Sequence, residues 1–139
     1  MQMDSLLILV LGVLFAIVIV WVYRTKRRAS TISQKELMAR MKSETNTFVL
    51  DVRTPKEYGS GHIPGATNIN HTELSNHLEK LRGYEDKDVV VYCERGVRAQ
   101  MAQKILKTAG FSNVYHLKGD MANWRRKELP TETGDREAS

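Results

Sequence analysis

Residues 89–98 read Val-Val-Val-Tyr-Cys-Glu-Arg-Gly-Val-Arg and predict a strand that turns directly into a helix. The run at 89–91 is β-branched and has no alternating polar face, which is typical of a strand buried on both faces of a parallel sheet. Cys93, the one cysteine among 139 residues, lies at the turn between the two elements. Beyond the turn, small and apolar residues recur at helical spacing: Ala99, Ala102, Ile105, Leu106 and Ala109.

The turn after Cys93 has the features of a site for a reactive thiol. Its backbone N–H groups are expected to point at the sulfur, and the dipole of the following helix adds partial positive charge. Arg95 and Arg98 add two formal positive charges. Such surroundings favour the thiolate over the thiol, so Cys93 is the predicted nucleophile.

Strands and helices alternate through the rest of the sequence after residue 32. Strands are predicted at 48–52, 66–69, 89–92 and 114–117. Helical segments are predicted from 33, 54, 72, 99 and 120. This order indicates an α/β domain with three layers, in which helices cover both faces of a mainly parallel sheet. Ligands bind beyond the carboxyl ends of the strands in such sheets, and Cys93 lies at one of those ends.

Several residues mark where these elements begin and end. Ser33 and Glu36 have the spacing of a capping box, and Thr72 is the expected cap of the helix that carries a leucine stripe. Gly110 is the expected glycine after the helix that ends at Ala109. The polar tail from Pro130 onward is expected to fray.

The N-terminal segment has the composition of a membrane span. Residues 6–22 contain no charge and no proline, and as a helix they would extend about 26 Å, near the lower limit for a bilayer core. Trp21 and Tyr23 lie at the end of the segment, where aromatic rings favour the lipid–water boundary. Four basic residues lie next, within 24–28, and they predict a cytoplasmic location for the domain after them. The rival interpretation, a cleaved signal peptide, lacks a basic start and a small-residue cleavage site.

The charge of the chain is concentrated beside this segment. Four of the 21 Lys and Arg residues lie at 24–28, and the remaining 17 face 15 of the 16 Asp and Glu residues, which leaves +2 from Ala29 onward. A nearly neutral domain gives no indication of a nucleic-acid partner. A single cysteine excludes an internal disulfide, which fits a reducing compartment.

Two stretches together resemble the rhodanese family of sulfurtransferases. One is Asp-Val-Arg-Thr-Pro-Lys-Glu-Tyr-Gly-Ser-Gly-His-Ile-Pro-Gly-Ala at 51–66, and the other is Val-Tyr-Cys-Glu-Arg-Gly-Val-Arg at 91–98, followed by Ala-Gly-Phe at 109–111 and Leu-Lys-Gly at 117–119. The resemblance covers roughly residues 31–133. It implies a rhodanese-like three-layer domain, which the transmembrane helix predicted from the apolar N-terminal segment precedes. We expect a transmembrane helix at 6–23, a basic juxtamembrane linker at 24–32, the rhodanese-like domain at 33–133 and a polar tail at 134–139.

The resemblance also implies a reaction. The Cys93 thiolate takes the outer sulfur of a small anionic donor such as thiosulfate, and the resulting persulfide passes it to cyanide or to a thiol or protein acceptor. The residues that would bind substrate or form the loop are Glu94, Arg95, Gly96, Val97 and Arg98. Arg95 would steer the donor, while the negative charge of Glu94 would weaken binding of a dianion or select a cationic or protein acceptor. No cofactor is implied.

Other polar residues of the two stretches have organising roles in this interpretation. Asp51, Arg53 and Glu57 are expected to form one buried or half-buried ion network, and His62 is expected to organise the glycine-rich loop by hydrogen bonding. Arg98 has two interpretations of equal weight, anion binding and a salt bridge. The remaining histidines, His71, His77 and His116, lack metal-ligand spacing, so no metal is expected. Asp120 stands where relatives often have a second glycine after Gly119, which leaves the local turn in doubt.

Two alternatives remain beside the sulfurtransferase. Phosphatases that share this fold need C-x5-R to wrap a phosphate, whereas this chain has C-x4-R and carries Ala99 at the place of that arginine. A phosphatase or an arsenate reductase is therefore disfavoured. The second alternative is a catalytically silent rhodanese-like binding or scaffold module at the membrane. Whether the chain is a sulfurtransferase or such a module, we expect a single-pass membrane protein. Residues 6–23 would hold it in a bilayer, the bacterial inner membrane, with its domain on the cytoplasmic face.

Overall fold

The structure is a computed structural model that describes residues 2–28 and 30–134. The chain divides into two compact units, Met1–Ser30 and Thr31–Ser139. Met1, Ala29, residues 135–139 and the side chains of residues 2, 3 and 24–28 lie outside the described part. The predicted basic cluster and most of the predicted polar tail therefore stay predictions.

The first unit is a single helix, α1 (Gln2–Arg28), which extends at both ends beyond the predicted span at 6–23. Its stretch Asp4–Tyr23 is long and apolar enough to cross a membrane, and its large apolar side chains are exposed. A signal sequence near an N-terminus meets the same criterion of length and composition. Backbone hydrogen bonding continues through the polar flanks because it does not depend on the apolar character of the side chains.

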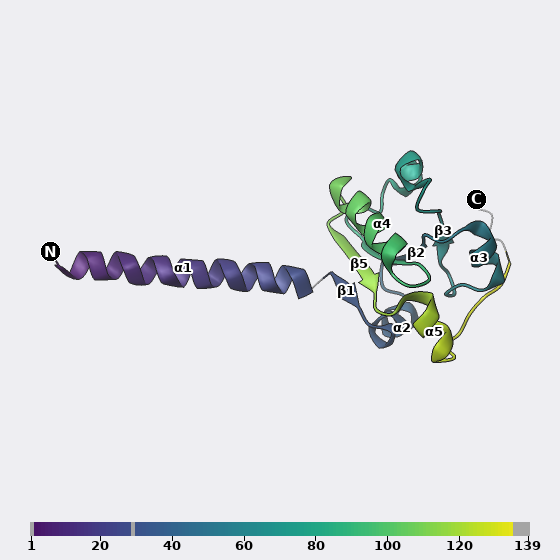
Figure 1. The fold of residues 1–139 in the computed structure, drawn as a ribbon, viewed down its shortest axis with the longest axis horizontal. Coiled ribbons are helices and arrows are strands. Elements are labelled where there is room, and N and C mark those ends of the chain that lie inside the picture. The colour runs from purple at the N-terminus through teal and green to yellow at the C-terminus, as the bar shows by residue number, and fades with distance from the viewer. Residues whose placement is uncertain (1, 29, 135–139) are drawn as a thin grey trace. The chain divides into compact units, whose positions relative to one another are not determined.

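The second unit is the predicted α/β domain (Figure 1). Its sheet has the order β1-β5-β4-β2-β3, and every neighbouring pair is parallel. The elements along the chain are β1 (Thr31–Ile32), α2 (Gln34–Lys42), β2 (Thr47–Asp51), α3 (Pro55–Ser60), β3 (Thr67–Asn68), the 3-10 helix η1 (Leu74–Leu81), β4 (Asp88–Tyr92), α4 (Val97–Thr108), β5 (Asn113–Leu117) and α5 (Asp120–Arg126). The strand β1 lies in the range where only a linker was expected.

Two apolar cores lie on opposite faces of the sheet, and successive residues of β4 divide between them. Val89 and Val91 pack with the buried faces of η1 and α4, whereas Val90 and Tyr92 pack with those of α2, α3 and α5. Side chains of a strand alternate between the two faces, so a strand covered on both must be apolar throughout. This explains the unbroken apolar run that the sequence shows before Cys93. Figure 1 shows α4 and α2 on opposite sides of the strands.

The predicted helix ends are partly correct. The hydroxyl of Ser33 accepts the N–H of Glu36 at 3.1 Å, and Gly110 follows α4 with φ +98°. Thr72 is not the cap that the sequence suggests, because η1 begins at Leu74 with Glu73 before it. The N–H of Thr72 instead donates to the side chain of Asn70. Leu74 and Leu81 of the leucine stripe are buried and Leu78 is partly buried, but the stripe lies on a 3-10 helix kinked at His77.

The expectation that the chain frays from Pro130 is wrong for residues 130–134. The indole N–H of Trp124, which is fully buried, donates to the carbonyl of Pro130 at 2.8 Å. Glu132 pairs with His62 through two backbone hydrogen bonds of 2.8 and 2.9 Å, and the N–H of Gly134 donates to Gly59. Backbone groups of this segment find partners in the domain, so its polar composition does not make it a free tail.

Candidate active site

Cys93 follows the last residue of β4 at the carboxyl edge of the sheet, and only 1% of the surface of Cys93 is exposed to solvent. The N–H of Gly96 donates to the Cys93 sulfur at 3.0 Å. Gly96 has φ +117°, and a Cβ there would lie 3.1 Å from an oxygen of Asp120 and 3.3 Å from the His116 ring. Glycine is therefore required twice, for its backbone conformation and for the space that these two side chains occupy.

The start of α5 holds the first half of the loop through three hydrogen bonds. The Asp120 carboxylate accepts the N–H of Cys93 at 2.9 Å. The N–H groups of Met121 and Ala122 donate to the carbonyls of Cys93 and Glu94 at 2.9 and 3.1 Å. In a planar trans peptide the carbonyl and the next N–H point in opposite directions. The N–H groups of the two residues after Cys93 therefore point away from α5.

The guanidinium of Arg98 forms a two-pronged ion pair with Glu57. Its two nitrogens lie 2.7 and 2.9 Å from the two carboxylate oxygens. Glu57 also closes a capping box with Thr54 at the start of α3, where it accepts the Thr54 N–H at 2.9 Å. The hydrogen bond from Arg98, with those from Thr54, lowers the pKa of Glu57 to about 2. Of the two interpretations of Arg98, this geometry matches the salt bridge.

The expected single network of Asp51, Arg53 and Glu57 is divided in the structure. Asp51 and Arg53 are buried together, with nitrogen–oxygen distances from 2.7 to 3.1 Å, whereas Glu57 pairs with Arg98. A fourth Arg53 contact reaches the carbonyl of Gly61 at 2.8 Å. Asp51 is the last residue of β2, and Arg53 lies two residues further along the chain. This pair fixes how the chain leaves the strand.

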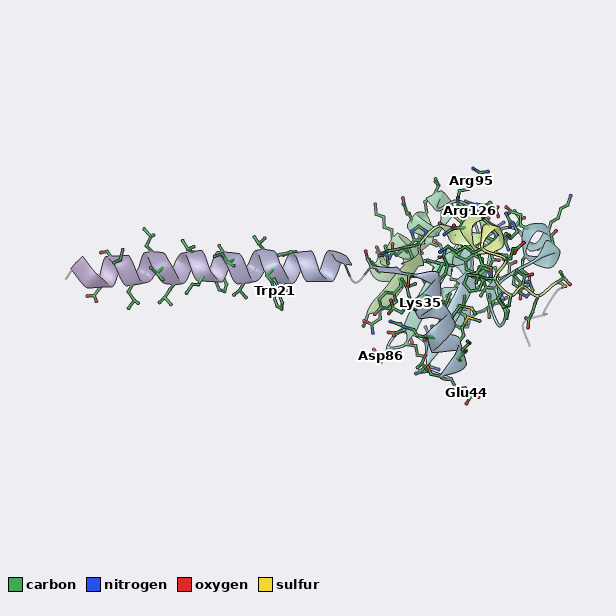
Figure 2. The ribbon with its side chains drawn as sticks, turned by 90° about the horizontal axis from the view of Figure 1, so that it is seen from below. Trp21, Lys35, Glu44, Asp86, Arg95 and Arg126 are labelled. Carbon is green, nitrogen blue, oxygen red and sulfur yellow. The ribbon has the colours of Figure 1, made fainter. Side chains whose placement is uncertain are left out.

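Glu94 lies between two cations. Its carboxylate is 3.5 Å from the Arg53 guanidinium and accepts a hydrogen bond from Arg125 of α5. The negative charge that the sequence places beside Cys93 is therefore balanced locally. Arg95 is exposed and its side chain extends away from the domain (Figure 2). Val97, the first residue of α4, is 72% exposed beside it.

His62 makes its contacts with α3 and with the segment at 130–134. Its ring stacks on Tyr58 with centroids 3.7 Å apart, and Nδ1 lies 2.9 Å from the Tyr58 carbonyl oxygen. Its Nε2 is 3.7 Å from a carboxylate oxygen of Glu132. These contacts tie the glycine-rich loop to α3 and to the residues that follow α5.

Sequence reasoning did not place Asp120 and His116 at this site. His116 Nε2 lies 3.0 and 2.9 Å from the two oxygens of Asp120, which is 2% exposed. Asp120 adopts φ +52°, which explains why glycine would suit the position. The departure from a second glycine was the available signal. It identified an unusual turn but not the carboxylate's contact with the Cys93 backbone.

Comparisons with known proteins agree with this fold. A family model of the rhodanese-like domain matches residues 33–127. YqhL, an uncharacterized protein of Bacillus subtilis, is 31% identical over 126 residues, which are 90% of this chain and 96% of YqhL. A sulfurtransferase of Allochromatium vinosum is 34% identical over 102 residues, which are 71% of this chain and 91% of that protein. The human single-domain sulfurtransferase TSTD1 matches with a TM-score of 0.65 and 26% identity over 70% of this chain and 96% of its own.

The strand order of the α/β domain and the cysteine loop at the carboxyl edge of its sheet are the features that define the class, the rhodanese-like domains. The chain belongs to the family of proteins with a rhodanese-like domain. Its sulfurtransferase relatives support a role within the sulfurtransferase family.

The Glu57–Arg98 pair makes a prediction about pH. The pKa of Glu57 is about 2 in the folded chain, against an ordinary value of 4.5. The pair's contribution is thus complete above pH 4.5 and is lost as the pH falls towards 2. Glu57→Gln is expected to lower the free energy of unfolding at pH 7 by roughly 0.5–1 kcal/mol, since solvent screens this partly exposed pair. The difference, measured by urea unfolding in detergent micelles, should shrink as the pH falls below 4.5 and vanish only below pH 2, where Glu57 is protonated in the folded chain as well.

A matched control is Glu79→Gln, which removes the carboxylate of an exposed ion pair with Arg82. This variant should match the parent chain within error across the same pH range. A Glu57→Gln difference that stays constant between pH 7 and pH 2 would contradict the assignment.

Proposed function

We propose that this chain is a sulfurtransferase that carries a sulfane sulfur on Cys93. The Cys93 thiolate attacks the outer sulfur of a donor such as thiosulfate, the sulfur–sulfur bond of the donor breaks, and sulfite leaves with the electron pair. An acceptor thiolate or cyanide then attacks the terminal sulfur of the persulfide, and the Cys93 thiolate is released. Both steps balance without a cofactor or an external oxidant.

The hydrogen bond from the Gly96 N–H to the Cys93 sulfur is the observation that carries this proposal. The thiolate and the persulfide are both anions. A hydrogen-bond donor that is already fixed in the loop stabilises them without reorganisation of the backbone. The start of α5 supports the same interpretation, because its hydrogen bonds to the carbonyls of Cys93 and Glu94 turn the next two N–H groups away from α5. We infer that these N–H groups also face the bound sulfur.

Charge around the loop bears on the donor. Arg98 and Arg53 are each paired with a carboxylate, so Arg95 is the exposed cation that we assign to steering an anionic donor. The contacts of Glu94 with Arg53 and Arg125 offset its charge, which reduces the expected penalty on a dianion such as thiosulfate. A small anionic donor and a thiol or protein acceptor are therefore the proposed partners.

The burial of Cys93 favours a second candidate, a rhodanese-like module that binds partners without catalysis. With only 1% of its surface exposed, Cys93 would then be a packed residue of the core formed by η1 and α4. Free cysteines are among the most buried residue types when they have only a packing role. The two candidates differ in whether the sulfur reacts.

Incubation of the full chain with thiosulfate, followed by intact-mass measurement, separates them. The sulfurtransferase gains about 32 Da, one sulfur atom, which cyanide or a thiol removes. Cys93→Ser should gain nothing, and Arg95→Ala should gain the same mass roughly tenfold more slowly with thiosulfate, because one charge near the site is lost. A folded chain that gains no sulfur from thiosulfate, a persulfide or a polysulfide is the scaffold module instead.

We also propose that α1 anchors the chain in a bilayer with the domain on the cytoplasmic face. The support is the apolar stretch Asp4–Tyr23 and the basic residues at 24–28 that come after it. A reporter fused after Ser139 should then behave as a cytoplasmic protein. Replacing the four basic residues at 24–28 with Gln is the matched test of their role, because it should weaken this orientation. Periplasmic reporter activity of the unaltered fusion would contradict the proposal.

A further inference from the structure

The buried Asp120 and the partly buried His116 form a pair against the cysteine loop. The Asp120 carboxylate touches His116 Nε2 with both oxygens and accepts the Cys93 N–H at 2.9 Å. The side chains of His116 and Asp120 are 15% and 2% exposed. The pair also lies against Gly96, the residue whose N–H donates to the Cys93 sulfur. Cys93, which carries the sulfur, and Gly96, whose N–H donates to it, therefore both lie against this pair.

A carboxylate at this depth requires a partner. Burial without water disfavours an isolated charge strongly, and an adjacent cation offsets that cost. The Cys93 N–H supplies one hydrogen bond, and the His116 ring faces both carboxylate oxygens. Asp120 also adopts φ +52°, a conformation that costs a non-glycine residue free energy. A charged, conformationally costly residue at a position that suits glycine calls for a contribution that glycine cannot make.

We propose that Asp120 and His116 are positioning residues for the reaction of Cys93, with Asp120 fixing the Cys93 backbone and His116 cancelling the charge that Asp120 places beside the thiolate. The proposal rests on Cys93 acting as a thiolate, as in the proposed function. Asp120 without a protonated His116 would be an unbalanced anion next to a second anion, which disfavours the thiolate and the persulfide alike.

Apart from Arg95, whose side chain is exposed, the other charged groups around the loop form ion pairs with one another. Those facing it from α3, from the end of β2, from the loop and from α4 and α5 form the pairs Glu57–Arg98, Asp51–Arg53, Glu94–Arg53 and Glu94–Arg125. In this proposal, His116 supplies the positive charge that faces both oxygens of Asp120. Removal of the His116 charge should disfavour the Cys93 thiolate. Removal of the Asp120 charge as well should cancel this effect.

The test measures how fast iodoacetamide alkylates Cys93 in the full chain as a function of pH, which reports the thiolate without any sulfur donor. His116→Gln keeps a hydrogen-bond donor but leaves Asp120 unbalanced, so the midpoint of the profile should rise by about 0.5–2 pH units. The double variant with Asp120→Asn carries no charge at the pair and should return towards the parent midpoint. A purely structural loss would not be rescued by a second substitution.

His77→Gln is the matched control, because the His77 ring bonds to the carbonyl of Glu73, which precedes η1 and lies outside the cysteine loop. The pH profile of this variant should equal that of the parent chain. An unchanged midpoint in H116Q, or a double variant no closer to the parent than H116Q, overturns the proposal. Should H116Q fail to fold, D120N, which retains an acceptor for the Cys93 N–H, is expected at or below the parent midpoint, and a rise overturns the proposal. Sulfur loading of Cys93, measured separately by mass, tests the proposed function independently.

Discussion

The parallel pairing of β2 with β4 is the constraint on which the rest of the site depends. Asp51 lies opposite Tyr92, so both strands end at the same level of the sheet. The N–H of Val52 extends the ladder by donating to the Tyr92 carbonyl at 3.1 Å. The chain then leaves both strands side by side, and the buried Asp51–Arg53 pair forms at the edge where the cysteine loop starts. A one-residue shift of this register would send Tyr92 and Cys93 to the opposite faces of the sheet.

The cysteine loop is held from two directions, by α5 and by α4. Helix α5 holds the carbonyls of Cys93 and Glu94, and α4 begins one residue after Gly96, whose N–H meets the sulfur. The Asp51–Arg53 and Glu57–Arg98 ion pairs near the loop each combine one positive and one negative charge. The backbone amides can therefore determine the local field at the sulfur, and they are already oriented before an anion forms. This arrangement suits the class of reaction that the sulfurtransferase relatives carry out.

Periodic patterns predicted the fold well, because a strand buried on both faces must be apolar and a helix must bury one stripe. The run at 89–91, the capping residue Ser33 and Gly110 all express such local requirements. The pattern did not reveal β1, because a strand of two residues is too short to show an alternation of apolar and polar residues. It did not reveal the partner of Glu57 either, because Arg98 is 41 residues away in the sequence. Asp120 and the segment at 130–134 were misjudged for the same reason. Their polar groups are satisfied by distant backbone atoms, which no local pattern contains.

The central claim is that the amides of the cysteine loop hold the sulfur anion. Amide proton and nitrogen chemical shifts of residues 94–98, recorded in detergent micelles before and after Cys93 is loaded with one sulfur, test it most directly. The account predicts that the Gly96 proton and those of its loop neighbours move downfield and exchange more slowly with solvent, because each donates to an added negative charge. Loop amides that stay unmoved in a chain whose mass shows full loading would contradict the account.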